Sequence, residues 1–168
     1  MIYSIDTSAL IDLDRYYPYD VFPSLWDEHI VNLVNERRLI ATEEVKEELE
    51  KGDDKLYKWL TNNCKSMFIK TNKPIMNRVI EIVTQFKNIV NPDKPDKNHA
   101  DPFVIALAFE FPNIYPNIFG NHQMAVVSHE KFTGNLKGPK IPDICREYKI
   151  RVLKLIDIFK TEGWKIGK

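Results

Sequence analysis

The chain has 168 residues, of which 43% are hydrophobic and 29% are charged, and its formal net charge is zero. These values are typical of one soluble globular domain, which we expect to span residues 1–168. A membrane-spanning protein is excluded because no apolar run is long enough to cross a bilayer. The N-terminus lacks the basic and apolar segments of a secretory signal, so we expect a cytoplasmic protein. Cys64 and Cys145 lie far apart and in no metal-ligand spacing, so we expect both to be buried free thiols.

Charge is unevenly distributed along the chain despite the neutral total. Residues 1–60 carry 14 acidic and 7 basic side chains, whereas residues 131–168 carry 10 basic and 4 acidic ones. If both segments border one cleft, an acidic centre that holds a cation would face a basic rim that holds a polyanion. Ordinary surface charge is the alternative explanation for most of the lysines.

The first predicted element is a buried strand over residues 1–5, which ends at Asp6 and is followed by two hydroxyl residues, Thr7 and Ser8. Open α/β folds carry their functional sites at the carboxyl edge of the sheet, so this pattern predicts a carboxylate at that edge. The alternative is structural, because Asp6, Thr7 or Ser8 is also suited to cap the helix that follows.

A helix, a short strand and an acidic helix are predicted next, over residues 25–34, 39–41 and 43–50. Val45 and Leu49 form the apolar stripe of the acidic helix, and at 3.6 residues per turn Glu48 lies beside that stripe. We therefore expect Glu48 at the edge of a buried site. We expect the other glutamates of this helix to be solvated, namely Glu43, Glu44, Glu47 and Glu50.

Two further helices are predicted, one with Leu56, Trp59 and Leu60 as its apolar stripe and a longer one over residues 74–90. The polar, proline-broken segment 91–98 is predicted to be a mobile loop that acts as a lid.

The helix that starts near Asp101 is apolar almost all round, so we expect it to be buried against the sheet. Asp101 before Pro102 fits an N-cap with proline at the first helical position. Burial of this helix would also place Asp101 at the carboxyl edge of the sheet.

The opening pattern of strand, hydroxyl and acid recurs after a turn-rich segment over residues 112–120. A compact strand over residues 124–127 ends in Ser128-His129-Glu130. A short helix, a last strand and a final helix are predicted at residues 141–145, at residues 150–155 and from Asp157.

Four acids thus stand at the ends or edges of predicted core elements: Asp6, Glu48, Asp101 and Glu130. In this order and spacing the chain resembles the PIN-domain ribonucleases, the fold of VapC-type toxins, and most closely a less characterised PIN-like branch. The matched motifs are the strand-Asp6-Thr7-Ser8 opening, Val45-Lys46-Glu47-Glu48-Leu49, Asp101-Pro102-Phe103-Val104-Ile105-Ala106 and Val127-Ser128-His129-Glu130. The resemblance implies a single α/β domain with a central, mostly parallel sheet flanked by helices.

The resemblance further implies an endoribonuclease that depends on Mg²⁺ or Mn²⁺. Asp6, Asp101 and Glu130 would be metal ligands, and Glu48 would ligate through water or orient the nucleophile. Clustered carboxylates raise one another's pKa unless a cation neutralises them, and hard oxygen ligands select these ions over zinc. Such an ion activates water and offsets charge on a phosphodiester. Glu130 and Ser128 stand where the family has aspartate and threonine, which weakens the case for a second metal.

Other predicted contacts surround these acids. Thr7, Ser8 and Ser128 are candidates to hold carboxylates or waters at the substrate site. Candidate phosphate contacts, with a merely exposed side chain as the alternative for each, are Lys97, His99, His129 and Lys131. The resemblance implies RNA as substrate and an antitoxin protein as partner. It also implies a homodimer, for which the aromatic loop Tyr16–Tyr19 is the candidate surface.

Competing functions make different demands on the first turn of the chain. A phosphatase of the haloacid-dehalogenase type needs a second aspartate two residues after Asp6, where this chain has Ser8. A dinucleotide-binding domain needs glycines in that turn, and there are none. The remaining alternative is a PIN-like module that keeps its acids but only binds RNA or protein.

Overall fold

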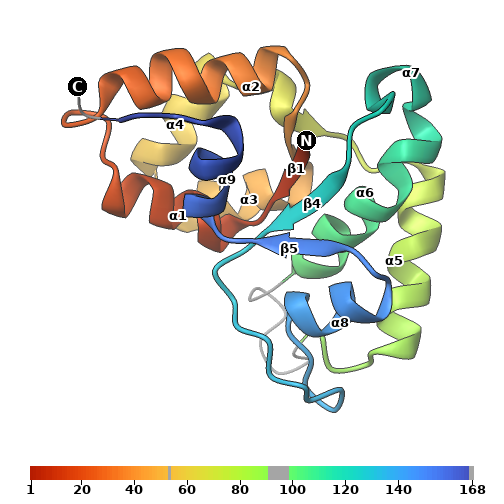
Figure 1. The fold of residues 1–168 in the computed structure, drawn as a ribbon. Coiled ribbons are helices and arrows are strands. Elements are labelled where there is room, and N and C mark those ends of the chain that lie inside the picture. Colours follow the sequence, from red (N-terminus) through yellow and green to blue (C-terminus); the bar gives the residue numbers. More distant parts are fainter. Residues whose placement is uncertain (53, 91–98, 167–168) are drawn as a thin grey trace.

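The structure is a computed structural model that describes residues 1–52, 54–90 and 99–166. Within these ranges, five parallel strands form one sheet in the order β3-β2-β1-β4-β5 (Figure 1). The strands are β1 (Ile2–Ile5), β2 (Leu39–Thr42), β3 (Phe68–Ile69), β4 (Met124–Val127) and β5 (Arg151–Leu153). This architecture confirms the predicted α/β class, and the sheet is parallel throughout rather than mostly so.

The central strand is β1, and its composition explains its position. All of its residues are buried, and a strand of a parallel sheet that is covered on both faces is typically a nearly continuous apolar run. It pairs with β2 on one side and along its whole length with β4 on the other. Its serine, Ser4, donates its hydroxyl to the Val104 carbonyl at 3.0 Å, so the buried polar group is satisfied.

The strand order reverses at β1. The chain adds β2 and β3 on one side of β1 and then returns to place β4 and β5 on the other side. Ligands of open α/β sheets bind in the crevice outside the carboxyl ends of the strands at such a reversal. Asp6 follows β1 and Ser128 follows β4, and the Asp6 N–H donates to the Val127 carbonyl at 2.9 Å. The sheet therefore brings both predicted patterns of strand, hydroxyl and acid to the same crevice.

Helices cover both faces of the sheet. In Figure 1, α1, α2 and α4 lie on one side of the sheet and α5, α6 and α8 lie on the other. In chain order the described helices are α1 (Thr7–Tyr16), the π-helix η1 (Leu25–Ile30), α2 (Val31–Asn35), α3 (Glu43–Gly52), α4 (Asp54–Asn63), the 3₁₀-helix η2 (Lys65–Met67), α5 (Lys73–Gln85), α6 (Asp101–Ile114), α7 (Pro116–Phe119), α8 (Ile141–Glu147) and α9 (Leu155–Glu162). Over the described ranges, none of these helices has both the length and the apolar character needed to cross a membrane.

The predicted burial of α6 is confirmed, but the predictions for its two ends are wrong. The helix already includes Asp101, and its N-cap is Ala100, whose carbonyl accepts the N–H groups of Phe103 and Val104 at 2.9 Å. Asp101 is therefore not the cap. At the other end, Pro112 falls in the last turn, and α6 continues to Ile114 before α7 forms in the segment predicted as turns. The loss of one backbone hydrogen bond at this proline is tolerated so close to the helix end.

Other predicted boundaries move by a few residues. The long helix α5 ends at Gln85 instead of residue 90, because Phe86 leaves the helical conformation (φ −120°, ψ 67°) and is buried in the core. The final helix begins at Leu155, two residues before Asp157. The short strand β3 was not predicted, since two residues carry no periodicity.

Two local predictions concern residues away from the sheet. Cys64 and Cys145 are confirmed as buried free thiols, and burial raises the pKa of the Cys64 thiol to about 12. The predicted lid over residues 91–98, which includes Lys97, lies outside the described residues.

The aromatic loop after α1 is only partly exposed. Tyr16 is 58% exposed, whereas Tyr17 packs edge-on against Phe22 and Phe159 with ring centroids 5.6 and 5.1 Å away. The surface available for a dimer contact is therefore smaller than the predicted Tyr16–Tyr19 segment, and dimerisation stays a prediction.

Candidate functional site

The four predicted acids meet at one cavity of about 200 Å³ at the carboxyl edge of the sheet. Asp6 comes from the end of β1, Glu48 from α3, Asp101 from the first residue of α6, and Glu130 from the segment after β4. The lining residues are Asp6, Thr7, Ser8, Ile11, Glu48, Asp101 and Glu130. Acids separated by up to 124 positions in the sequence thus share one pocket, and their functional roles stay predictions.

Asp6 is held by two hydroxyl groups. It is 3% exposed, and its Oδ2 accepts hydrogen bonds from Ser8 Oγ at 2.5 Å and from Ser128 Oγ at 3.2 Å. Burial raises the pKa of Asp6 to about 6, the Ser8 hydroxyl opposes this rise, and the charges of Glu130 and Glu48 add to it. Ser8 and Ser128, two of the three hydroxyl residues predicted to hold carboxylates, therefore contact one.

Asp101 is the least compensated group in the cavity. It is 5% exposed, and its buried Oδ2 has no hydrogen-bond partner among the described residues. Burial, followed by repulsion from Asp6, Glu130 and Glu48, raises the pKa of Asp101 to about 9. An orphaned carboxylate oxygen at a cavity wall is costly unless a proton or a cation occupies it.

Glu48 joins two segments that are distant in the sequence. Its Oε2 accepts the Thr7 hydroxyl at 2.5 Å, and its Oε1 accepts the Ala100 N–H at 3.0 Å. Both carboxylate oxygens are therefore engaged in ordering the start of α1 and the start of α6. This geometry gives Glu48 a positioning role, since it holds the backbone that presents Asp101.

Glu130 is already paired with a cation that the sequence reasoning missed. Its Oε1 lies 2.8 Å from Lys140 Nζ, and its Oε2 accepts the Ile141 N–H at 2.9 Å. The hydrogen bond to Glu130 raises the pKa of Lys140, and the nearby Asp101 and Asp6 charges contribute as well. No spacing rule links Lys140 to the acids, because an extended loop separates it from Glu130.

Asp143 orders that loop and was also missed. Its carboxylate accepts hydrogen bonds from the backbone N–H groups of Thr133, Gly134 and Lys140, each at 2.8 Å, and from the Thr133 hydroxyl at 2.7 Å. Asp143 is 1% exposed, and these hydrogen bonds keep its pKa below the ordinary aspartate value despite burial. The loop that positions Glu130 and Lys140 is thus tied to the first turn of α8.

Replacement of Asp143 by asparagine is expected to destabilise the fold by about 2–4 kcal/mol, because an amide cannot accept all of these hydrogen bonds and leaves buried donors unpaired. Thermal unfolding measures the loss. Asp20→Asn, the same change at an exposed position, is the matched control. Equal unfolding temperatures for the two variants would contradict the role of Asp143.

The predicted phosphate contacts do not line the cavity in the part of the chain that the structure describes. The His129 imidazole pairs through Nδ1 with the Asp12 carboxylate on α1, and the backbone N–H of His129 donates to Ser8 Oγ at 3.3 Å. His99 and Lys131 are exposed, and Lys97 lies outside the described residues. The prediction that these side chains contact substrate phosphates gains no support from their positions.

The prediction that Glu44 is solvated is wrong. Its Oε1 accepts the Thr71 hydroxyl at 2.9 Å, and its buried Oε2 has no partner among the described residues. Glu44 lies in the first turn of α3, beside the segment that follows β3, and this neighbour covers it. Helical periodicity alone could not reveal the cover, because β3 was not predicted.

The residues of the cavity fit a hard divalent cation in their chemistry. Every charged group of the lining is a carboxylate, and the Asp101 Oδ2 has no partner among the described residues. Burial, followed by repulsion from the other acids, raises the pKa values of Asp6 and Asp101. Within the described ranges, no three histidine, cysteine or acidic side chains are already arranged as the ligands of one ion. Glu48 and Glu130 instead accept hydrogen bonds from groups of the chain. Glu130 would therefore have to exchange Lys140 or the Ile141 N–H for the cation in order to act as a ligand.

Comparisons with known proteins assign the chain to a family whose function is unknown. No curated protein matches it, and no solved structure matches it. One family model, described as a domain of unknown function (DUF4411), matches residues 3–166, which is nearly the whole chain. The chain therefore belongs to the DUF4411 family.

Proposed function

We propose that this protein is a metal-dependent endoribonuclease that hydrolyses RNA phosphodiester bonds at the four-carboxylate cavity. The observation that carries the proposal is the buried, unpartnered Oδ2 of Asp101 in a cavity shared with Asp6, Glu48 and Glu130. A cluster of this kind destabilises the empty fold, which is expected where selection acts on a bound cation rather than on stability.

Asp6, Asp101 and Glu130 are the proposed ligands of Mg²⁺ or Mn²⁺, because carboxylate oxygens suit these ions better than zinc. When bound, such an ion offsets the charge that develops on a phosphodiester and makes water a better nucleophile. Ser8 and Ser128 hold the Asp6 carboxylate in place, and Glu48 holds the backbone in front of Asp101. Release of Lys140 from Glu130 would leave an ammonium group at the cavity that can face a substrate phosphate.

The choice of RNA as substrate depends on the resemblance of the acidic motifs to PIN-domain ribonucleases. The excess of basic residues over 131–168 is consistent with a polyanionic substrate, and Lys140 brings one of these charges to the site. The cavity is small and acidic, so it suits a phosphodiester bond in a flexible single strand rather than a rigid duplex.

A module that binds RNA or protein without cleaving it is the second candidate. One observation favours it, namely that both oxygens of Glu130 are already engaged by Lys140 and by the Ile141 N–H. If that pairing does not open, the site loses a proposed ligand and the remaining carboxylates order the fold only.

Removal of the metal separates the two candidates. We expect wild-type protein to cleave end-labelled single-stranded RNA in Mg²⁺ or Mn²⁺ and to be inactive in EDTA, with activity restored by adding back either ion. Asp6→Asn, purified in parallel, controls for contaminating nucleases. Tight RNA binding without cleavage across both ions would reject the ribonuclease and favour the binding module.

A toxin role and an antitoxin partner are further parts of the proposal. They depend on the resemblance to VapC-type toxins alone. Induced expression of wild type beside Asp6→Asn tests them, because a toxin should arrest growth only when its site is intact. Equal growth of the two cultures would count against toxicity.

A further inference from the structure

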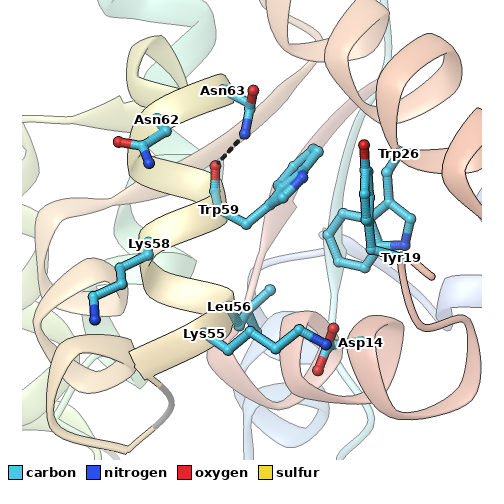
Figure 2. A pocket seen from close by; sticks show the side chains of 9 residues that line it. All are labelled: Asp14, Tyr19, Trp26, Lys55, Leu56, Lys58, Trp59, Asn62 and Asn63. Carbon is cyan, nitrogen blue, oxygen red and sulfur yellow. Dashed lines mark hydrogen bonds between the residues drawn. The ribbon is translucent and has the colours of Figure 1, made fainter.

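A second, aromatic pocket lies between α4 and the segment that follows α1 (Figure 2). Its volume is about 230 Å³, and the larger part of its wall is apolar. The lining residues are Asp14, Tyr19, Trp26, Lys55, Leu56, Lys58, Trp59, Asn62 and Asn63. The acidic site described above does not use any of these residues.

The aromatic walls are fixed in place by their own contacts. The Trp26 indole N–H donates to the Tyr17 carbonyl at 2.7 Å, and the Tyr19 hydroxyl donates to Asp27 at 3.0 Å. The Trp59 ring meets the Trp26 ring at 73° and the Tyr19 ring at 48°, so neither ring is stacked face to face on Trp59. The Trp59 side chain is only half-buried, so part of it stays open to a planar ligand.

Polar groups stand at both ends of this pocket. Figure 2 shows Asn62 and Asn63 on the last turn of α4 at one end, where the Asn63 amide donates to the Trp59 carbonyl at 2.9 Å and keeps its oxygen as an acceptor. At the other end, the side chains of Lys55 and Asp14 extend toward each other. Amide, carboxylate and ammonium groups around an aromatic wall are the groups that recognise the edge of a nucleobase and an adjoining phosphate.

The aromatic pocket and the acidic cavity lie along one face of α1. Thr7 and Ile11 line the acidic cavity and Asp14 lines the aromatic pocket, and these positions are spaced by four and three residues. Residues at this spacing lie on one side of a helix, and the rise of about 1.5 Å per residue separates Thr7 from Asp14 by about 10 Å. A single strand that passes the carboxylates can therefore continue along α1 into the aromatic pocket.

The volume of the pocket bears on its occupant. Pockets for drug-sized ligands have about 300–1,000 Å³, so this smaller space suits a single planar group rather than a folded segment of a partner protein.

We propose that the aromatic pocket binds one nucleobase of a single-stranded RNA whose backbone lies at the acidic cavity. Trp59 is the stacking platform and Lys55 faces the adjoining phosphate. This inference rests on the proposed ribonuclease function for the identity of the substrate.

The test measures binding of a fluorescently labelled, short single-stranded RNA by anisotropy. All proteins carry Asp101→Asn and are assayed in Mg²⁺, so that the RNA stays intact. We expect Trp59→Ala to weaken binding at least about fivefold, which corresponds to the lower end of a stacking contact of about 1 kcal/mol. Trp59→Phe keeps a ring and should retain most of the affinity. Tyr16→Ala removes an exposed aromatic side chain of α1 outside the pocket and should have no effect.

Lys55 provides a second, independent readout. Lys55→Ala should reduce the dependence of RNA affinity on salt concentration, and Lys55→Arg should restore it, because a phosphate contact releases counterions. Thermal unfolding first establishes that the Trp59→Ala protein is folded. If it then binds RNA as tightly as the protein that carries Asp101→Asn alone, the proposal is rejected and a protein segment becomes the better occupant.

Cleavage by wild-type protein is measured separately, so the two proposals fail in different ways. Binding that depends on Trp59 without any cleavage would retain the nucleobase pocket and reject the ribonuclease. Cleavage by wild-type protein, together with RNA binding that is unchanged by Trp59→Ala, would retain the ribonuclease and reject the nucleobase pocket.

Discussion

Asp101→Asn is expected to abolish RNA cleavage and, in the same protein, to stabilise the metal-free fold. Replacing a group that hydrogen-bonds a metal ligand typically costs about 10–100-fold in metal affinity or activity, so loss of a ligand itself should cost at least about 100-fold. Stability should rise because asparagine carries no charge in the place where burial and three neighbouring acids disfavour the carboxylate. We expect a gain of about 1–3 kcal/mol near neutral pH, less than the full shift because the new amide is itself poorly paired.

Opposite signs for activity and stability distinguish a ligand site from a structural one. Asp157→Asn is the matched control, since Asp157 lies in the first turn of α9 and accepts the Lys154 N–H at 3.0 Å. That change keeps an acceptor for this N–H but removes a negative charge from the first helical turn, so it should lower stability by about 0.3–1 kcal/mol and leave cleavage unchanged. Cleavage rates and thermal unfolding in EDTA measure both quantities. A destabilised Asp101→Asn protein would show that Asp101 stabilises the fold rather than a bound cation.

The metal-free protein is expected to lose stability as the pH rises from about 5 to about 9. Asp6 and Asp101 both have raised pKa values, about 6 and about 9, against an ordinary value of 3.8. In this window the folded state therefore holds protons that the unfolded state has already released. Stability then falls with increasing pH, by at most about 1.4 kcal/mol per pH unit for each such proton. The decline should end above the folded pKa of Asp101.

Thermal unfolding in EDTA across this pH range measures the slope. The lowered pKa values of Asp143 and Glu162 act in the opposite sense, but their contributions disappear only as the pH falls below about 4–5, outside this window. Asp101→Asn should flatten the curve above pH 6, and saturating Mg²⁺ or Mn²⁺ should do so for wild type by stabilising the ionised carboxylates. A wild-type curve in EDTA that is already flat would mean that the cavity does not disfavour its charges.

Much of the site could be predicted from the sequence because its signals are local. Each acid belongs to a short pattern: an apolar strand that ends in Asp6, a helical stripe beside Glu48, an apolar helix that begins at Asp101, and a second strand that ends before Glu130. These patterns depend on the periods of strands and helices and on which residues can lie beside a buried face. In a parallel sheet such ends gather at one edge, so the four acids could be assigned to one cavity.

The hydrogen-bond partners of these acids could not be predicted from the sequence. Ser128 reaches Asp6 across 122 positions, and Glu48 reaches Ala100 across 52. The roles of Lys140 and Asp143 could not be predicted either, because a loop without periodicity places them beside the site.

The sequence by itself determined the α/β class, the strand that ends at Asp6 and the set of four acids, since each follows from residue order over a single element. Only the tertiary structure decided how those acids are charged and paired. The Asp101 carboxylate is unfavourable because α6 buries it among other acids, and the Glu130 carboxylate is compensated because Lys140 lies beside it. Desolvation and pairing depend on neighbours in space, and residue order along one element does not specify those neighbours.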